Sequence, residues 1–288
     1  MIKFALPGIY NHFDLNRVFL ELIQDRPEYV NDEFGISAVY GCFPVSIWNG
    51  GRKVEGYCSC ERMLEEINFY NRNGISCRYT FTNSLIEEAH LSDRFSNLIL
   101  ANSNTGINAV IVCSELLEDY IRKTYPSFKI ISSTTKCITD LDAFEDECKR
   151  DYDLVVLDYT LNNSASVLST AYPQKVEILV NAYCRDNCPE RKKHYHALSI
   201  GQLAYSQEPS FHDCPFVLED FYTVKETRKS FVTLEKVREF ASKGIINFKI
   251  EGRTNSKYDV LESYIYYLIK REYQGVARLQ VLKRLGSL

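Results

Sequence analysis

Two cysteines that could bind a metal stand four residues apart in the stretch VNAYCRDNCPERKKHYH, where they are Cys184 and Cys188. A third, Cys214, lies in the segment HDCPF, and like Cys188 it precedes a proline. Thiolate sulfur is a preferred ligand of zinc and of iron–sulfur clusters, and Cys-Pro pairs occur in cluster-binding loops. The C-x3-C spacing alone leaves three interpretations open: structural thiols, a zinc site or an iron–sulfur cluster.

Histidines near these cysteines also suggest zinc. His194 and His196 follow Cys188, and His212 stands two residues before Cys214. On a helix, residues i and i+2 do not share a face, so His194 and His196 would be poor joint ligands. We expect them to be solvated or packed against aromatic neighbours. The charged run ERKKHYH is expected to be a solvated face, with binding of a phosphate or carboxylate as the alternative.

The composition is that of an ordinary soluble globular protein, with 288 residues of which 45% are hydrophobic and 25% charged. The net charge of -4 argues against broad binding to nucleic acid or to an anionic membrane. The opening MIKFALPGIYNHF lacks the pattern of a secretory signal, and no apolar run is long enough to span a membrane. Together with 10 cysteines, these features predict a cytoplasmic protein in a reducing compartment, with at least half of its thiols in the core.

Eight short apolar runs alternate with amphipathic segments along the chain. These runs are Ile2–Leu6, Ile36–Tyr40, Ser76–Phe81, Asn108–Val112, Phe128–Ser132, Asp153–Leu157, Val176–Val180 and Ile246–Ile250. They are nearly continuously apolar, which is typical of parallel strands that helices cover. The pattern predicts an α/β fold, a (β/α)8 TIM-type barrel that spans residues 1–288 as a single domain. A doubly wound open sheet is the alternative.

The segments between these runs carry signals for the ends of helices. Asp14 is a possible N-cap of the first helix, and Ser114 is the expected N-cap of a helix that ends before Pro126. Asn73 and Gly74 form a good helix stop. The last segment, residues 255–273, is predicted to be the longest helix.

The regular spacing breaks once, between the seventh and eighth runs. Residues 181–245 are far more than one helix needs, and long loops in compact domains are usually functional. We expect a cysteine-containing insertion at residues 181–232, with a possible short hairpin over residues 216–233 and a helix that starts at Thr233.

In a barrel, the residues that follow each strand gather at the face where barrel enzymes have their active sites. This rule places Cys42, Cys184 and Cys188 at one rim, so that they and Cys214 could bind one ion or cluster. It also places Asp158 there, although that residue is as well suited to cap the next helix. Amide and hydroxyl side chains follow the other strands.

Glu251 and Arg253 follow the eighth run and are the candidate catalytic residues. Arginine can bind a carboxylate or phosphate in a bidentate fork, and a buried glutamate can act as an acid or base. The alternative is an internal ion pair that braces the last loop. Because side chains alternate along a strand, Lys249 is expected on the same side as Glu251.

The segment INFKIEGRTNSKYDVLESYIYYLIK, residues 246–270, closely resembles the signature of the collagenase-like peptidase family U-32. The segments FVTLEKVREFASKGI, ISAVYGC, VEILVNAYCRDNC and HDCPF are similar to further parts of that family's pattern. The match is specific at Lys249–Arg253, moderate at the cysteines and thin between residues 45 and 175.

The resemblance implies a barrel fold and, as in several members, a 4Fe–4S cluster bound by four cysteines. Those members support oxygen-independent hydroxylation in ubiquinone synthesis or on RNA bases. One type takes a ligand from near the second strand, which implies Cys42 as the fourth ligand beside Cys184, Cys188 and Cys214. The cysteine spacing departs from the family pattern, and the rivals for the fourth place are Cys58, Cys60, Cys113 and Cys137.

Three functions are compatible with these sequence features. The first is an iron–sulfur barrel protein that takes part in a redox modification. Its substrate would be RNA, a small molecule or a peptide, and a protein partner would supply electrons or form a second subunit. The second is a peptidase of the U-32 type, although neither a Cys–His–third-residue trio nor an H-E-x-x-H motif can be found. The third is a non-catalytic binding module braced by zinc or by plain thiols.

Overall fold

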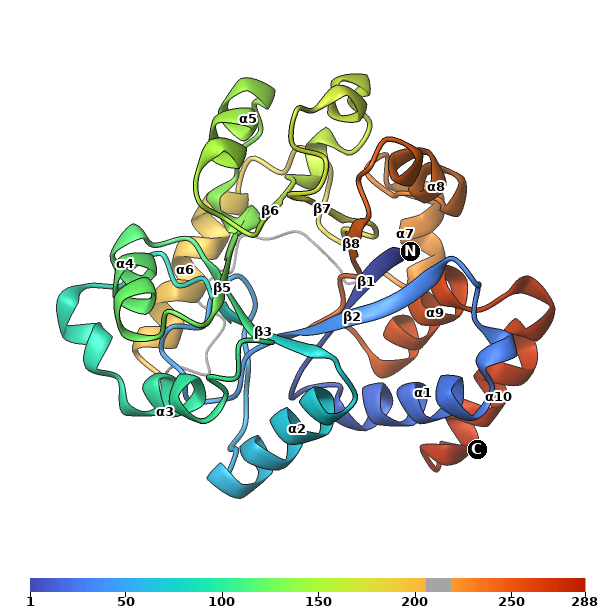
Figure 1. The fold of residues 1–288 in the computed structure, drawn as a ribbon, viewed down its shortest axis with the longest axis horizontal. Coiled ribbons are helices and arrows are strands. Elements are labelled where there is room, and N and C mark those ends of the chain that lie inside the picture. Colours follow the sequence, from blue (N-terminus) through green and yellow to red (C-terminus); the bar gives the residue numbers. More distant parts are fainter. Residues whose placement is uncertain (206–218, 288) are drawn as a thin grey trace.

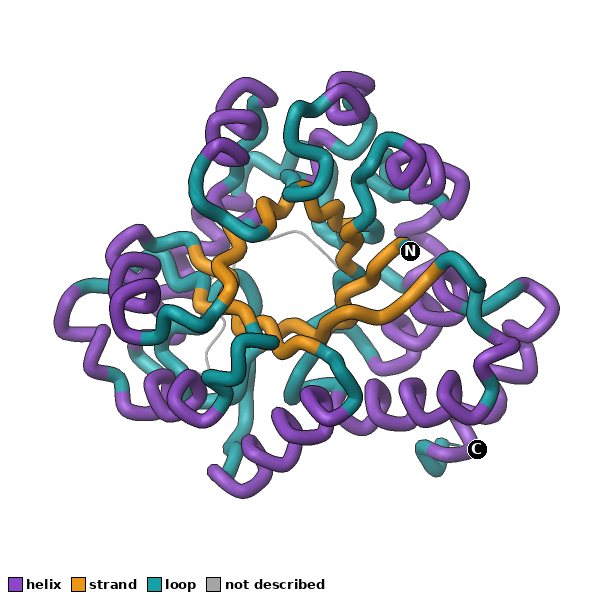
Figure 2. Tube along the Cα trace, in the orientation of Figure 1, coloured by secondary structure: helices purple, strands orange, loops and turns teal. Residues whose placement is uncertain are grey.

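The computed structural model describes residues 1–205 and 219–287 and shows a closed barrel of eight parallel strands (Figure 1). The strands form a ring at the centre of the molecule, and the helices lie outside it (Figure 2). Each strand pairs with its neighbours in sequence, and β8 closes the ring against β1. The strands are β1 (Ile2–Pro7), β2 (Phe34–Gly41), β3 (Ser76–Phe81), β4 (Ala109–Val112), β5 (Lys129–Ser132), β6 (Leu154–Val156), β7 (Val176–Leu179) and β8 (Asn247–Lys249). The predicted (β/α)8 barrel is thus confirmed.

Ten α-helices are found in the described residues, most of them between successive strands. They are α1 (Phe13–Asp25), α2 (Cys60–Arg72), α3 (Arg94–Asn102), α4 (Glu115–Thr124), α5 (Leu141–Lys149), α6 (Arg191–Leu203), α7 (Phe221–Thr227), α8 (Leu234–Ser242), α9 (Lys257–Leu268) and α10 (Gln274–Arg284). Within residues 1–205 and 219–287, none of these helices has the length and apolar character needed to cross a bilayer.

The two faces of each strand pack into different cores. Phe4 and Leu6 of β1 point outward into the main hydrophobic core beneath the helices, whereas Ala5 belongs to a small cluster inside the barrel. Ala38 and Ala109 also line the interior, where barrels usually carry bulkier side chains. These small residues leave room for long polar side chains within the ring of strands.

Three charged residues occupy that interior and are nearly fully buried: Arg78 on β3, Glu177 on β7 and Lys249 on β8. Arg78 forms an ion pair with Glu177, and the Lys249 Nζ lies 3.8 Å from the second oxygen of the same carboxylate. A buried charge is stable only when it is paired or hydrogen-bonded, so the polar interior is a specific feature of this barrel.

Helix ends follow the sequence signals except at α1. Ser114 caps α4 by accepting a hydrogen bond from the Leu117 N–H at 3.3 Å, and Gly74 follows α2 with a φ of 71°. The prediction that Asp14 is the N-cap of α1 was wrong, because the helix begins at Phe13 and its N-cap is His12. Asp14 instead lies in the first turn, where a carboxylate still interacts favourably with the helix dipole.

The last predicted helix is broken into two. Helix α9 ends at Leu268, and Ile269 adopts an extended conformation in which it forms an isolated β-bridge with Val30. The backbone N–H of Lys270 donates to the Tyr29 carbonyl at 2.8 Å. These two contacts with the segment that precedes β2 end the helix. The prediction that the last helix is the longest was therefore wrong, because α9 has 12 residues and α1 has 13.

The insertion between β7 and β8 contains helices, and the expected hairpin is wrong for its described part. Residues 219–233 contain α7, which Asp220 caps by accepting hydrogen bonds from the N–H groups of Tyr222 and Thr223, both at 2.9 Å. Phe221 and Val224 of α7 are buried at helical spacing. The alternating apolar residues therefore belong to a short amphipathic helix.

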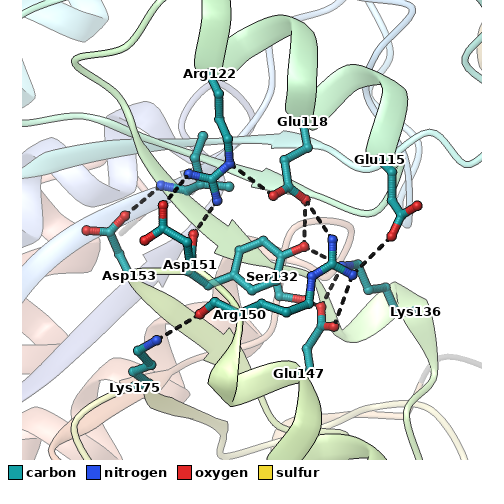
Figure 3. Close-up of polar contacts among 12 residues, drawn as sticks. Glu115, Glu118, Arg122, Ser132, Lys136, Glu147, Arg150, Asp151, Asp153 and Lys175 are labelled. Atoms are coloured by element: carbon teal, nitrogen blue, oxygen red, sulfur yellow. Dashed lines mark hydrogen bonds and ion pairs between the residues drawn. The ribbon is translucent and has the colours of Figure 1, made fainter.

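Outside the barrel, a polar network joins α4 and α5 to β5 (Figure 3). The Tyr152 hydroxyl donates to Glu118 at 2.5 Å and accepts from Lys136 Nζ at 2.9 Å, and Lys136 also binds Glu147 at 2.6 Å. Burial raises the pKa of Glu147, but hydrogen bonds from Lys136 and Ser132 outweigh burial and lower it. The network stabilises this side of the barrel wall.

Candidate active site at the barrel mouth

A pocket opens at the carboxyl end of the barrel, where the sequence predicted the active face. Lys249, Glu251 and Arg253 from the end of β8 line it, so the expectation that Lys249 and Glu251 share a side is confirmed. Most of the remaining lining residues bear a hydroxyl group; these are Tyr40, Thr80, Thr82, Ser133, Thr134, Thr135, Tyr159 and Tyr195. The others are Gly51, Arg52, Ile111 and Leu179. The pocket is therefore small and rich in side chains that can form hydrogen bonds.

Glu251 is held in a fixed position. Its carboxylate forms an ion pair with Arg52 and accepts a hydrogen bond from the Tyr183 backbone N–H at 3.1 Å. Its own backbone N–H donates to the Asn181 Oδ1 at 2.7 Å. Although burial acts in the opposite direction, the carboxylate of Glu251 raises the pKa of Arg52. The predicted brace of the last loop is present, but the partner of Glu251 is Arg52 and not Arg253.

Arg253 is a buried cation whose hydrogen bonds in the described ranges all go to neutral groups. It donates to Thr80 Oγ1 at 2.7 Å, to Asn49 Oδ1 at 3.3 Å and to the Gly50 carbonyl at 3.1 Å. Over the part of the chain that the structure describes, it forms no ion pair within 4.0 Å. Burial lowers the pKa of Arg253 to about 10, and the charge of Arg52 acts in the same direction.

Lys249 is the second buried cation at the mouth. Its side chain is 8% exposed, and its Nζ lies 4.0 Å from the centre of the Tyr40 ring and 3.8 Å from Glu177. A separation of 3.8 Å is too long for a hydrogen bond. Burial lowers the pKa of Lys249 to about 8, since the attraction of Glu177 is opposed by the nearby charges of Arg78 and Arg253.

The loop between β2 and α2 brings Arg52 to the mouth through two glycines. A Cβ on Gly50 would lie 2.3 Å from the Thr82 carbonyl oxygen, so only glycine fits against the end of β3. Gly51 has a φ of 72°, which side chains rarely adopt, and a Cβ there would approach Thr135 to 2.9 Å. The close approach lets the Gly50 carbonyl accept from Arg253.

Helix α6 of the insertion runs along the rim of the mouth, from the end of β6 to the end of β3 (Figure 1). Near its start, Arg191 forms an ion pair with Asp158 after β6, with one hydrogen bond of 3.1 Å. Near its end, the Ser199 carbonyl accepts a hydrogen bond from Asn83 after β3 at 3.2 Å. Between these anchors, Tyr195 lines the mouth pocket. Asp158 also caps the short 3-10 turn that follows it, which agrees with the expected capping role, whereas its role as a site residue stays a prediction.

Cys184 and Cys188 lie in the same insertion, and both are partly exposed free thiols. Cys184 lines a second pocket together with His194, Arg52 and Glu251, so it is next to the mouth. Burial raises the pKa of Cys184, and a charge on Cys188 acts in the same direction.

The four predicted cluster ligands are not brought together by the described residues alone. Cys42 is 2% exposed and packs in the main hydrophobic core, where burial raises its pKa to about 12. Within residues 1–205 and 219–287, no three His, Cys, Asp or Glu side chains are placed to hold a metal ion. Cys214 and His212 lie outside the described residues. The four-cysteine cluster stays a prediction, as do the alternative ligands Cys58, Cys60, Cys113 and Cys137.

Arg52, Asn49 and Tyr195 also shape the site but were not predicted from the sequence. The first two come from the loop WNGGRK, whose paired glycines were a signal of close backbone approach. Tyr195 lies between His194 and His196, the two histidines whose position near the cysteines suggested zinc. His194 and His196 do lie on one helix, α6, at the spacing that makes them poor joint ligands.

The solved structure of the U32 peptidase Mk0906 resembles this chain with a TM-score of 0.55 and 12% sequence identity. The likeness covers 89% of this chain and 94% of that chain. No protein-family model matches the sequence, and no curated protein matches it. At this level of identity the likeness concerns the fold, and it supports the resemblance that the KIEGR segment indicated. The chain therefore has the barrel fold of a U32 peptidase.

Proposed function

We propose that the barrel mouth is an active site that binds a small substrate bearing a carboxylate or phosphate group. The observation that carries the proposal is the excess of positive charge at the mouth and in the barrel interior beneath it, counted over the described residues there. Within that part of the chain, Arg52 and Arg78 are each paired with one glutamate, whereas Arg253 has only neutral partners and Lys249 has no hydrogen bond. Two buried cations in these surroundings are stabilised when an anion binds between them.

The size of the site favours a small molecule over RNA or a long peptide. Helix α6 and the loop before α2 both line the mouth pocket, through Tyr195 and Arg52, and the Asn49 amide donates to Gln202 of α6 at 3.3 Å. Thr80, Ser133 and Thr135 add hydroxyl groups that can bind further polar atoms of the substrate. In this site Arg253 binds the anionic group, and Glu251, fixed by Arg52, is placed to accept a proton.

Calorimetric titration with phosphate, sulfate, acetate and citrate tests this proposal. We expect at least one of these anions to bind wild-type protein and Lys3→Met, because Lys3 is an exposed lysine at the opposite end of the barrel. Binding should be lost in Arg253→Met and in Lys249→Met. Absence of binding by the wild type, or equal binding by all four proteins, would argue against an anion site at the mouth.

A redox role with an iron–sulfur cluster is the second candidate, favoured by the position of Cys184. This thiol lines a pocket that Glu251 also lines, and Cys188 follows it in the same insertion. When bound, such a cluster would supply electron transfer beside the substrate. Anaerobic purification with iron and sulfide analysis tests it: iron and sulfide should be present in the wild type and absent in Cys184→Ala. Zinc without iron would support the thiol-braced binding module instead.

The peptidase function is less well supported by the geometry. A cysteine nucleophile acts as a thiolate, but burial raises the pKa of the Cys184, Cys42 and Cys113 thiols. Hydrolysis of peptides that disappears when a mouth residue is substituted would restore this function.

A further inference from the structure

The side chain of Lys249 has the surroundings of an amine nucleophile. More than nine-tenths of the side chain is buried, yet the residue lines the mouth pocket where a ligand would bind. The structure gives its Nζ no hydrogen bond from the described residues, and only the 3.8 Å approach to Glu177 offsets its charge. A buried ammonium in these surroundings loses its proton readily, and neutral lysine amines form imines with carbonyl groups.

A proton acceptor lies beside it. One oxygen of Glu177 binds Arg78, while the oxygen nearer to Lys249 is buried and has no hydrogen-bond partner among the described residues. This carboxylate oxygen can take a proton from the ammonium and return it later. Arg78 holds Glu177 in place through their ion pair.

The anion-binding arginine is at a suitable position for an oxo acid. Lys249 and Arg253 both line the pocket, and they are four residues apart at the end of β8. A carboxylate bound by Arg253 would direct the neighbouring carbonyl of the same molecule toward the lysine. Thr80, which accepts from Arg253 at 2.7 Å, lines the same pocket.

We propose that Lys249 forms an imine with the carbonyl group of a small oxo acid whose carboxylate is bound by Arg253. The inference rests on the anion site proposed above. In the first step the neutral amine attacks the carbonyl carbon, a C–N bond forms, and a proton moves from nitrogen to oxygen. In the second, the C–O bond breaks and water leaves. Ammonium and ketone are thereby converted into protonated imine and water, with no net change in protons or electrons, and Glu177 holds the proton between the steps.

Reductive trapping tests the inference. The protein is incubated with glyoxylate or pyruvate, treated with borohydride and examined by intact mass and peptide mapping. We expect one stable adduct per chain, located on Lys249 in the wild type, because hydride converts the imine into a secondary amine. Peptide mapping of the wild type gives this result without any variant that has to fold. An adduct on other lysines alone, or none at all, would overturn the proposal.

Variants separate failure of the imine from failure of the anion site. Lys249→Arg keeps the positive charge but has no primary amine, so it should still bind the oxo acids in calorimetry and lose the trapped adduct. Lys3→Arg is the matched control and should keep both properties. Binding of glyoxylate or pyruvate by the wild type without trapping would refute the imine and leave the anion site standing. If the wild type neither bound nor trapped these acids but bound phosphate or another of the anions above, the imine alone would be refuted, and if it bound none of them, both proposals would fail.

Discussion

Replacement of Arg253 by methionine should leave the stability of the protein almost unchanged, because two effects oppose each other. A pKa of about 10 in place of 12.5 corresponds to roughly 3 kcal/mol against the charged form in the folded state. The three hydrogen bonds to Thr80, Asn49 and the Gly50 carbonyl are lost, at about 1 kcal/mol each. We therefore expect a free energy of unfolding within about 1 kcal/mol of the wild type.

Urea denaturation followed by circular dichroism measures this difference. Arg78→Met is the matched control, since that arginine is paired with the buried carboxylate of Glu177. Breaking a buried ion pair leaves an uncompensated charge and costs about 3–5 kcal/mol. If Arg253→Met lost as much stability as Arg78→Met, Arg253 would be a structural residue. That result would refute the inference that its charge is left without an anionic partner until a ligand binds.

Three other substitutions test the geometry of the barrel and its surroundings. Gly50→Ala should destabilise the protein by about 1–3 kcal/mol in calorimetric melting, because its Cβ would lie 2.3 Å from the Thr82 carbonyl; an unchanged melt would contradict the close approach. Tyr152→Phe removes the 2.5 Å hydrogen bond to Glu118 and should cost about 1–3 kcal/mol in urea denaturation, whereas a neutral effect would mean that the network is not stabilising. Lys249→Met should be more stable than the wild type at low pH, because burial disfavours the charged lysine of the folded wild type. This advantage should shrink as the pH rises from about 8 to about 10.5. In that range the unfolded wild-type chain still holds the lysine proton and the folded one does not, so the wild type gains stability with pH. A stability difference that stayed constant over that range would show that Lys249 is not perturbed.

The sequence predicted the barrel because each strand carries its own signal. Buried parallel strands are short, nearly continuous apolar runs, and all eight were recognised with ends that differ from the structure by up to two residues. From strand ends alone, Glu251 and Arg253 could be placed at the mouth. The prediction that Lys249 faces the same side needed only the alternation of side chains along β8.

What the sequence could not predict depends on contacts between distant segments. Arg52 reaches Glu251 from a loop whose path is set by the fit of Gly50 against β3. Helix α9 ends early because Ile269 pairs with Val30, more than two hundred residues away in the chain. The hairpin prediction was wrong because a short amphipathic segment is ambiguous. A pattern of apolar and polar residues over a few positions fits a helix such as α7 as well as a strand.

A crystal structure of the protein with bound selenate would test the central claim most directly, because selenium in this tetrahedral anion gives an anomalous signal that locates it. We predict a peak at the barrel mouth between the Lys249 amine and the Arg253 guanidinium, which disappears in Arg253→Met crystals grown in the same way. No peak in the mouth, with selenate found only on the outer surface, would contradict an anion site there.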